Sequence, residues 1–111
     1  MQRRRILILL KLIAGHFLCD YPLQGDFIGK FKNRNISRDF GIPWWHLMTA
    51  HAMIHAGMIA IITNRIDLSI IEFLIHFITD CLKCEKWIDI HVDQFIHILC
   101  KIGYWLVLIN V

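Results

Sequence analysis

The sequence predicts an all-α fold: an integral membrane protein whose four helices form an antiparallel bundle around a polar His/Asp site in the core. Three observations predict it. Of the 111 residues, 57% are hydrophobic and only 19% are charged, which is more apolar surface than a small core can bury. The apolar residues fall into four runs, each near the roughly 20 residues that a helix needs to cross a bilayer. Each run also carries ionisable side chains at helical spacing.

The four runs predict four membrane spans within a single domain, residues 1–111. The last two connections are short, as expected between antiparallel neighbours, whereas the first is a long, basic, Gly- and Pro-containing loop at about residues 25–43. Its FIGKF portion is expected to form a short interfacial helix. The predicted spans cover about residues 6–23, 44–63, 68–84 and 91–109.

The first span opens on a basic stretch, MQRRRILILL, that resembles a secretion signal. No small-x-small cleavage motif follows it, so a retained span is expected. Pro22 should end or kink this helix near its mouth, which leaves the position of Gln24 open.

Charge and aromatic residues bear on location and partners. Trp44, Trp45 and Trp87 fall at predicted membrane borders, where indole rings favour the headgroup layer. We expect a multi-pass protein of a bacterial inner (cytoplasmic) membrane whose partner is the lipid bilayer and which binds no nucleic acid. The sequence does not decide whether the protein forms homo-oligomers. The alternative to a membrane protein is a soluble four-helix bundle whose apolar surface is buried by oligomerisation. Basic residues only weakly favour the side of the long loop as cytoplasmic.

Polar residues four apart lie on one helix face and can share a ligand. Every predicted span contains such a pair, and a lone histidine on an apolar helix is usually a hydrogen-bonded core residue, but several ionisable groups in hydrocarbon require pairing. A rise of about 1.5 Å per residue predicts two layers, with imidazoles below carboxylates, in a cup that opens toward the long loop. His55 and Glu72 are expected somewhat deeper. The paired residues are His16 with Asp20, His51 with His55, Glu72 with His76 and Asp80, and Asp93 with His97.

Imidazole and carboxylate groups together are the ligands of zinc, manganese or non-haem iron. We therefore predict a divalent metal, zinc first and manganese or iron as alternatives, with one or two ions in the cup. The residues Gln24, Lys83, Gln94 and Lys101 are expected to contact substrate or to support the ligands. The predicted metal ligands are His16, Asp20, His51, His55, His76, Asp80, Asp93 and His97.

Specific positions are predicted for two lysines. Lys101 lies four residues after His97 at the depth of Glu72, so we expect these two to pair, with Lys11 as a competing partner. Lys83 should lie at the mouth of the cup. Cys81 and Cys84 form a CxxC motif without a second pair, so a thiolate zinc site is not favoured.

The segments GHFLCDYPLQ, HAMIH, ExxxHxxxDxxK and DQFIH occur in this order between His16 and His97. Together they resemble a family of small bacterial and phage multi-span membrane proteins known only as a domain of unknown function. The resemblance implies a multi-pass helical protein with a shared polar site. It does not imply any particular activity. A looser similarity is to inner-membrane metal-dependent hydrolases with HxxxD and HxxxH pairs on neighbouring spans.

Three functions are compatible with these residues. The first is a membrane-embedded metal-dependent hydrolase of an anionic substrate, such as a lipid phosphate approaching the basic face, with Asp80, Asp93 and Glu72 as candidate catalytic groups. In that reading Asp80 or Asp93 is the general base. The second is a redox protein with haem b or a di-iron centre. The third is a non-catalytic metal carrier or phage-type membrane effector.

Overall fold

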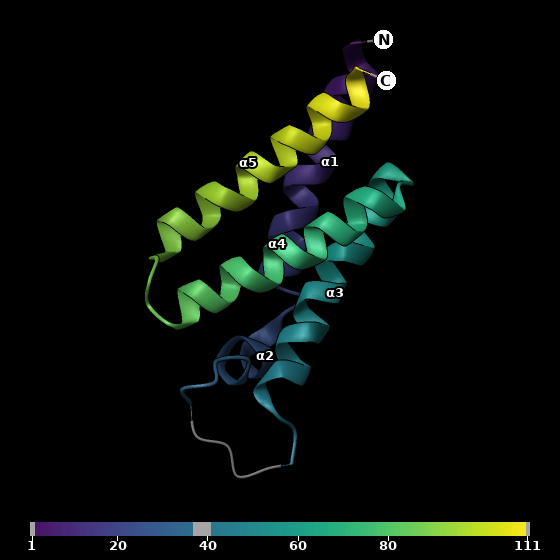
Figure 1. Ribbon diagram of the computed structural model, residues 1–111. Coiled ribbons are helices and arrows are strands. Elements are labelled where there is room, and N and C mark those ends of the chain that lie inside the picture. Colours follow the sequence, from purple (N-terminus) through teal and green to yellow (C-terminus); the bar gives the residue numbers. More distant parts are fainter. Residues whose placement is uncertain (1, 37–40, 111) are drawn as a thin grey trace.

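The computed structural model describes residues 2–36 and 41–110, which form helices and no strands (Figure 1). The all-helical prediction is therefore confirmed for this part of the chain. Residues 37–40 of the predicted basic loop lie outside the described residues. The helices are α1 (Gln2–Asp20), α2 (Gly25–Phe31), α3 (Trp44–Thr63), α4 (Ile66–Cys84) and α5 (Ile90–Ile109).

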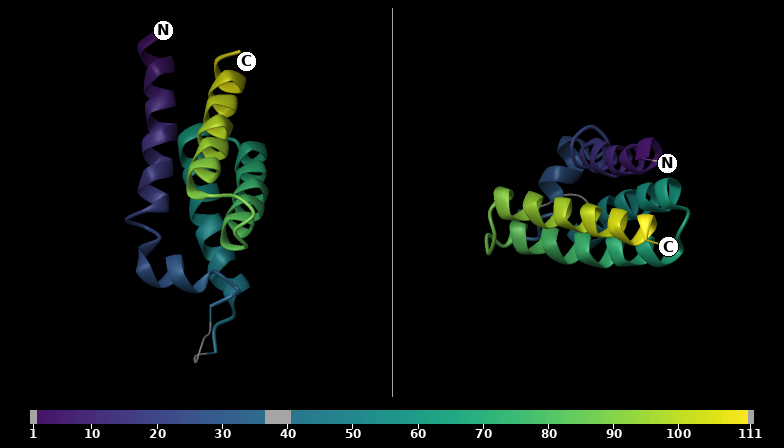
Figure 2. Two further views of the ribbon diagram at one scale, coloured as in Figure 1. Left: turned by 90° about the vertical axis from the view of Figure 1, so that its left-hand side faces the viewer. Right: turned by 90° about the horizontal axis from the view of Figure 1, so that it is seen from above.

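The four long helices lie side by side, and each packs against two others. The contacting pairs are α1 with α3, α3 with α4, α4 with α5, and α5 with α1. Successive long helices run in opposite directions, so the two ends of the chain lie at the same end of the molecule (Figures 1 and 2). The molecule measures 52 × 24 × 22 Å. The predicted spans match these four helices to within a few residues.

The break between α1 and α2 follows from local sequence. Pro22 cannot continue a helix, and α1 ends at Asp20, as predicted. Gly25 then takes a positive φ of 70°, a conformation that glycine adopts without steric cost, at the first residue of α2. The axes of α1 and α2 differ by 77°, so α2 crosses one end of the long helices (Figure 2).

The connections from α3 to α4 and from α4 to α5 are short, and residues within them cap the helices. Asn64 adopts the left-handed conformation after α3, and its N–H donates to the Ala60 carbonyl at 2.8 Å. The Asp89 carboxylate accepts from the Val92 N–H at 2.8 Å and caps the start of α5. These caps allow the next helix to return alongside the previous one.

The polarity of this fold is reversed relative to a water-soluble bundle. Its described interior holds twelve polar or charged residues, among them Glu72 and Asp93 with no exposed surface. Large apolar side chains cover the outside, for example Ile61 at 80% and Phe95 at 62% exposure. Exteriors this apolar are typical of surfaces that contact lipid or other proteins.

Two helices, α3 and α5, are long and apolar enough to cross a membrane, and α1 with α2 would make a third if the bent pair is one span. The helix α4 does not qualify, although residues 68–84 were predicted as a span. Its charged residues Asp67, Glu72, Asp80 and Lys83 dilute its hydropathy. Glu72 and Asp80 point inward and are fully buried, so composition alone understates how apolar the outer face of α4 is.

An apolar cluster joins all four long helices at the end where the chain termini lie. It consists of Leu12, Ile59, Leu68 and Tyr104, one residue from each helix. Close contact of α1 with α3 beside this cluster requires Gly15, because a Cβ there would lie 2.9 Å from the Met58 Cγ.

Candidate metal centre

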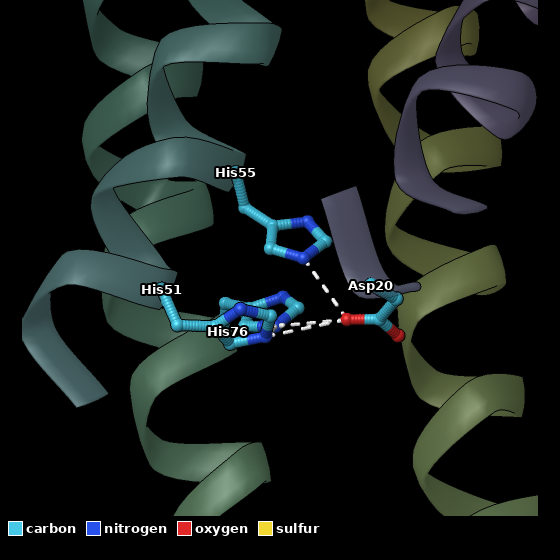
Figure 3. Close-up of side chains that lie close together, drawn as sticks. All are labelled: Asp20, His51, His55 and His76. Atoms are coloured by element: carbon cyan, nitrogen blue, oxygen red, sulfur yellow. Dashed lines mark hydrogen bonds and ion pairs between the residues drawn. The ribbon is translucent and has the colours of Figure 1, made fainter. Parts of the chain in front are cut away.

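Four buried side chains converge between the long helices (Figure 3). Asp20 ends α1, His51 and His55 lie one turn apart on α3, and His76 lies on α4. One ligand atom from each lies within 4.8 Å of all the others, so this group could hold a metal ion. We call these four residues the ligand group.

Four of the six donor–donor distances in the ligand group are close to those around one tetrahedral ion. The Asp20 Oδ1 atom lies 3.0 Å from His55 Nε2, 3.3 Å from His51 Nε2 and 3.6 Å from His76 Nε2. The Nε2 atoms of His51 and His76 are 3.1 Å apart. Metal–ligand bonds of about 2.0–2.2 Å in a tetrahedron place the donor atoms about 3.4 Å apart, close to these distances.

Asp20 also differs from the other buried acids in that it has no lysine partner among the described residues. The buried acids of the described chain are Asp20, Glu72, Asp80 and Asp93, and the last three each have a lysine nitrogen within 4.0 Å. Among the residues described, Asp20 has only imidazole and amide partners. A buried carboxylate without a cation is costly, so this position calls for positive charge.

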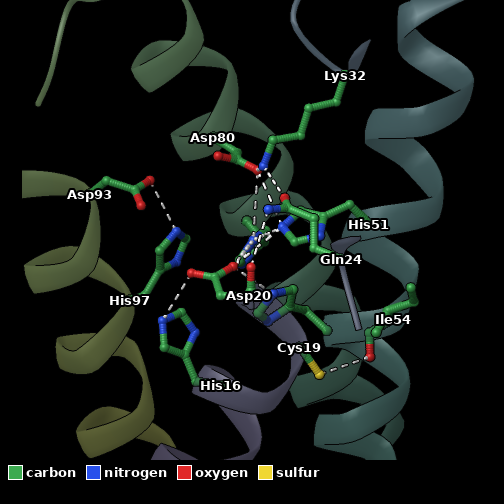
Figure 4. Close-up of polar contacts among 12 residues, drawn as sticks. His16, Cys19, Asp20, Gln24, Lys32, His51, Ile54, Asp80, Asp93 and His97 are labelled. Carbon is green, nitrogen blue, oxygen red and sulfur yellow. Dashed lines mark hydrogen bonds and ion pairs between the residues drawn. The ribbon is translucent and has the colours of Figure 1, made fainter. Parts of the chain in front are cut away.

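A second set of polar contacts lies beside Asp20 on the side of α5, where Figure 4 shows Asp93 and His97. The Gln94 amide nitrogen donates to Asp20 Oδ2 at 2.8 Å, and the Gln94 oxygen lies 2.9 Å from His16 Nε2. His97 Nε2 lies 3.2 Å from Asp93 Oδ1. The His97 ring also stacks on His76, with centroids 4.2 Å apart. Thus His16, Asp93, Gln94 and His97 can orient the ligand group.

Lys32 belongs to the predicted basic loop, yet it does not lie on the surface. Its side chain is 3% exposed and its Nζ lies 2.5 Å from both Asp80 Oδ2 and Gln24 Oε1. The 77° turn into α2 carries Lys32 over the end of the long helices. Asp80 Oδ2 is in turn 3.3 Å from His51 Nε2, so Lys32 belongs to the surroundings of the ligand group.

The predictions for the other lysines can be compared directly with the structure. The predicted pair of Lys101 with Glu72 is present, with one Nζ–Oε2 distance of 2.9 Å, and both side chains are buried. Lys11 is exposed and does not take part. Lys83, predicted at the mouth of the cup, is half-buried and lies 3.0 Å from Asp80 Oδ1 and 3.7 Å from Asp93 Oδ2.

The predicted two-layer arrangement differs from the structure. Asp20 does not lie in a separate carboxylate layer, because its Oδ1 is surrounded by imidazole nitrogens. His55, expected deeper, is the nearest of these imidazoles. Of the eight predicted metal ligands, the structure brings four within reach of one ion and places the others, His16, Asp80, Asp93 and His97, beside them.

The fold and the buried His/Asp group define a small all-helical protein with a candidate metal centre and two helices able to cross a membrane. The chain belongs to the family described as protein of unknown function (DUF3307), which matches residues 8–111. No curated protein and no solved structure matches it.

Proposed function

We propose that this chain is an integral membrane protein, a multi-pass antiparallel four-helix bundle that binds one divalent ion and hydrolyses an anionic substrate. The reversed polarity of the fold supports the membrane assignment. The outer face of α4 carries exposed Ile70, Leu74 and Ile78, although the helix holds four charged residues. In a bacterial cell the inner membrane would supply the apolar surroundings that this face needs.

The observation that carries the metal proposal is the position of Asp20. It is a buried carboxylate without a lysine or arginine partner in the described chain, and three imidazole nitrogens lie 3.0–3.6 Å from one of its oxygens. A divalent cation would neutralise Asp20 and accept the three nitrogens. Zinc suits this donor set, and manganese or iron would also fit.

The hydrolytic step would use an ion-bound water, whose pKa the metal lowers toward neutrality. Of the three candidate catalytic acids, we assign the general base to Asp93, because its oxygens contact His97 and Gln94 and its nearest lysine nitrogen, on Lys83, is 3.7 Å away. Both oxygens of Asp80 are already occupied by Lys32 and Lys83, and Glu72 is held by Lys101. The partly exposed Lys83 side chain, beside Asp80 and Asp93, would attract an anionic substrate.

Haem b is less compatible with this packing. Axial histidines must lie on opposite sides of a flat macrocycle. Here the His55 and His76 rings stack directly, with centroids 3.6 Å apart. A non-catalytic metal-holding role has more support, because the ligand group offers four protein donors and structural zinc sites are closed in this way. Catalysis by zinc would require the ion to accept a fifth ligand.

Elemental analysis tests the metal proposal. Protein purified without a polyhistidine tag or chelator should contain one divalent ion per chain, and His76→Ala should lose it. His46→Ala is the matched control, because His46 is an exposed histidine at the start of α3. A metal-free wild type, or equal metal content in both variants, would refute the proposal.

A separate assay tests hydrolysis. Metal-loaded protein in detergent should release phosphate from a phosphatidic acid, and Asp93→Asn should lower the rate by about 10²-fold or more while it retains the metal. Metal retention with no turnover of anionic lipid esters would favour the closed, non-catalytic site.

A further inference from the structure

A pocket of about 240 Å³ opens at the end of the molecule where α2 crosses the long helices. It lies between the start of α3 and the end of α4 and includes the segment that follows α2. Its lining residues are Lys32, Arg34, Trp44, Met48, Cys81, Leu82, Cys84, Glu85 and Trp87.

The lining combines two kinds of surface. Trp44, Met48 and Leu82 provide an apolar wall, and tryptophan favours the depth of lipid headgroups. Lys32 and Arg34 provide cationic groups at the same place. An amphipathic ligand with a negative head and an apolar tail matches both surfaces.

The pocket is connected to the ligand group through Lys32. Its Nζ contacts Asp80 Oδ2, which lies 3.3 Å from His51 Nε2. A lysine ammonium has three donors, and the described contacts to Asp80 and Gln24 use two. The third donor can serve an anion in the pocket while the buried ion pair stays intact.

We propose that this pocket binds the phosphate group of an anionic membrane lipid, with Lys32 and Arg34 as its cationic contacts. The lipid phosphate is then connected to His51 of the ligand group through two residues, Lys32 and Asp80. Presentation of the lipid to the metal rests on the proposed function, whereas binding in the pocket does not depend on it.

Glu85 allows the proposal to be tested by a gain of affinity as well as by a loss of affinity. Its Oε1 accepts from Arg34 Nε, and Glu85 also lines the pocket. This hydrogen bond lowers the pKa of Glu85 below its ordinary value, so the carboxylate is ionised at neutral pH and competes with phosphate for Arg34. The pair is partly exposed, so an incoming phosphate can displace the carboxylate at little cost.

Binding can be measured on chelator-treated protein in detergent by the fluorescence of Trp44 and Trp87 during titration. Dihexanoylphosphatidic acid should bind at least tenfold more tightly than dihexanoylphosphatidylcholine or inorganic phosphate. Arg34→Gln should weaken phosphatidic acid binding about tenfold, the loss of one charge-assisted contact. Glu85→Gln should tighten it, a result that damage to the fold would not produce.

The matched control is Lys30→Gln, which removes one positive charge from an exposed position on α2 outside the pocket. It should change the affinity less than twofold. Equal affinity for the phosphatidylcholine, equal losses in Arg34→Gln and Lys30→Gln, or weaker binding in Glu85→Gln would overturn the pocket assignment. Inorganic phosphate binding as tightly as the lipid would overturn the lipid as its source. Because the titration uses metal-free protein, a failed metal analysis leaves this result unaffected.

Discussion

The two ends of the long helices are built from opposite kinds of residue. Near the chain termini, Leu12, Ile59, Leu68 and Tyr104 form an apolar cluster with one residue from each helix. Toward α2 the same four helices meet through histidines, carboxylates and lysines. Apolar packing holds one end by shape alone, whereas the other end depends on how completely its charges are matched.

The comparison indicates where function resides. A buried ion pair rarely stabilises more than the apolar groups that could replace it, so a helix bundle gains little stability from its polar end. The ligand group, in which Asp20 lacks any lysine or arginine partner in the described chain, therefore supports the proposed binding role. Between the two ends lies the buried pair of Glu72 and Lys101.

The largest effect is expected where charge matching is broken. Lys101→Met leaves Glu72 buried without a cation and should lower the free energy of unfolding by about 3–5 kcal/mol. The double variant Glu72→Gln with Lys101→Met should recover most of the loss, and Lys11→Met, at an exposed lysine, should change little. Unfolding by denaturing detergent, followed by circular dichroism, measures the difference. Equal effects of the two single lysine variants would contradict the comparison.

A slightly smaller effect is expected at the ligand group. Divalent metal at about 100 times its Kd should stabilise the wild type by about 3 kcal/mol. Asp20→Asn should abolish this stabilisation, because it removes the anionic ligand, yet the metal-free variant should be no less stable than the metal-free wild type. Thermal unfolding with and without metal tests both statements. A destabilised metal-free Asp20→Asn protein would show that Asp20 serves folding rather than binding.

At the apolar end, Leu12→Ala should cost about 2 kcal/mol, because Leu12 is fully buried and its removal leaves a cavity. Metal content should stay at the wild-type level. Leu10→Ala, at a position 60% exposed, is the control and should have little effect. Loss of metal in Leu12→Ala would mean that the two ends are not independent.

The smallest effect is expected outside both regions. Lys86 adopts a φ of 64° just after α4, a left-handed conformation that glycine takes without the Cβ penalty. Lys86→Gly should therefore raise the free energy of unfolding by about 0.5–1 kcal/mol. Lys86→Ala keeps the Cβ and should bring no such gain. Melting temperatures of the two variants provide the comparison, and equal values would exclude backbone strain at this position.

Much of the fold could be predicted because local sequence patterns indicate where each helix begins and ends. Runs of about 20 apolar residues predicted the four long helices, and Pro22 correctly predicted the end of α1. Four-residue spacing predicted that the histidines and acids of one helix share a face. Equal depth along the helices predicted the pair of Glu72 and Lys101, which is confirmed.

Other parts of the site could not be predicted from spacing. Depth counted along a helix treats the helices as parallel rods, so it separated Asp20 from the imidazoles that surround it. Lys32 lies in the predicted basic loop, and no local sequence pattern indicates that its ammonium group reaches Asp80. The side-chain lengths and the tilt of each helix decide such contacts.

The sequence by itself determined which residues face inward, because helical periodicity places them on one side of each helix. Apart from the pair of Glu72 and Lys101, the tertiary structure decided which of them meet. The crossing of four helices and the turn into α2 selected Asp20, His51, His55 and His76 from a larger set of candidates. The physical reason is that a shared ligand requires donor atoms within a few ångströms, a distance that depends on helix packing rather than on position in the chain.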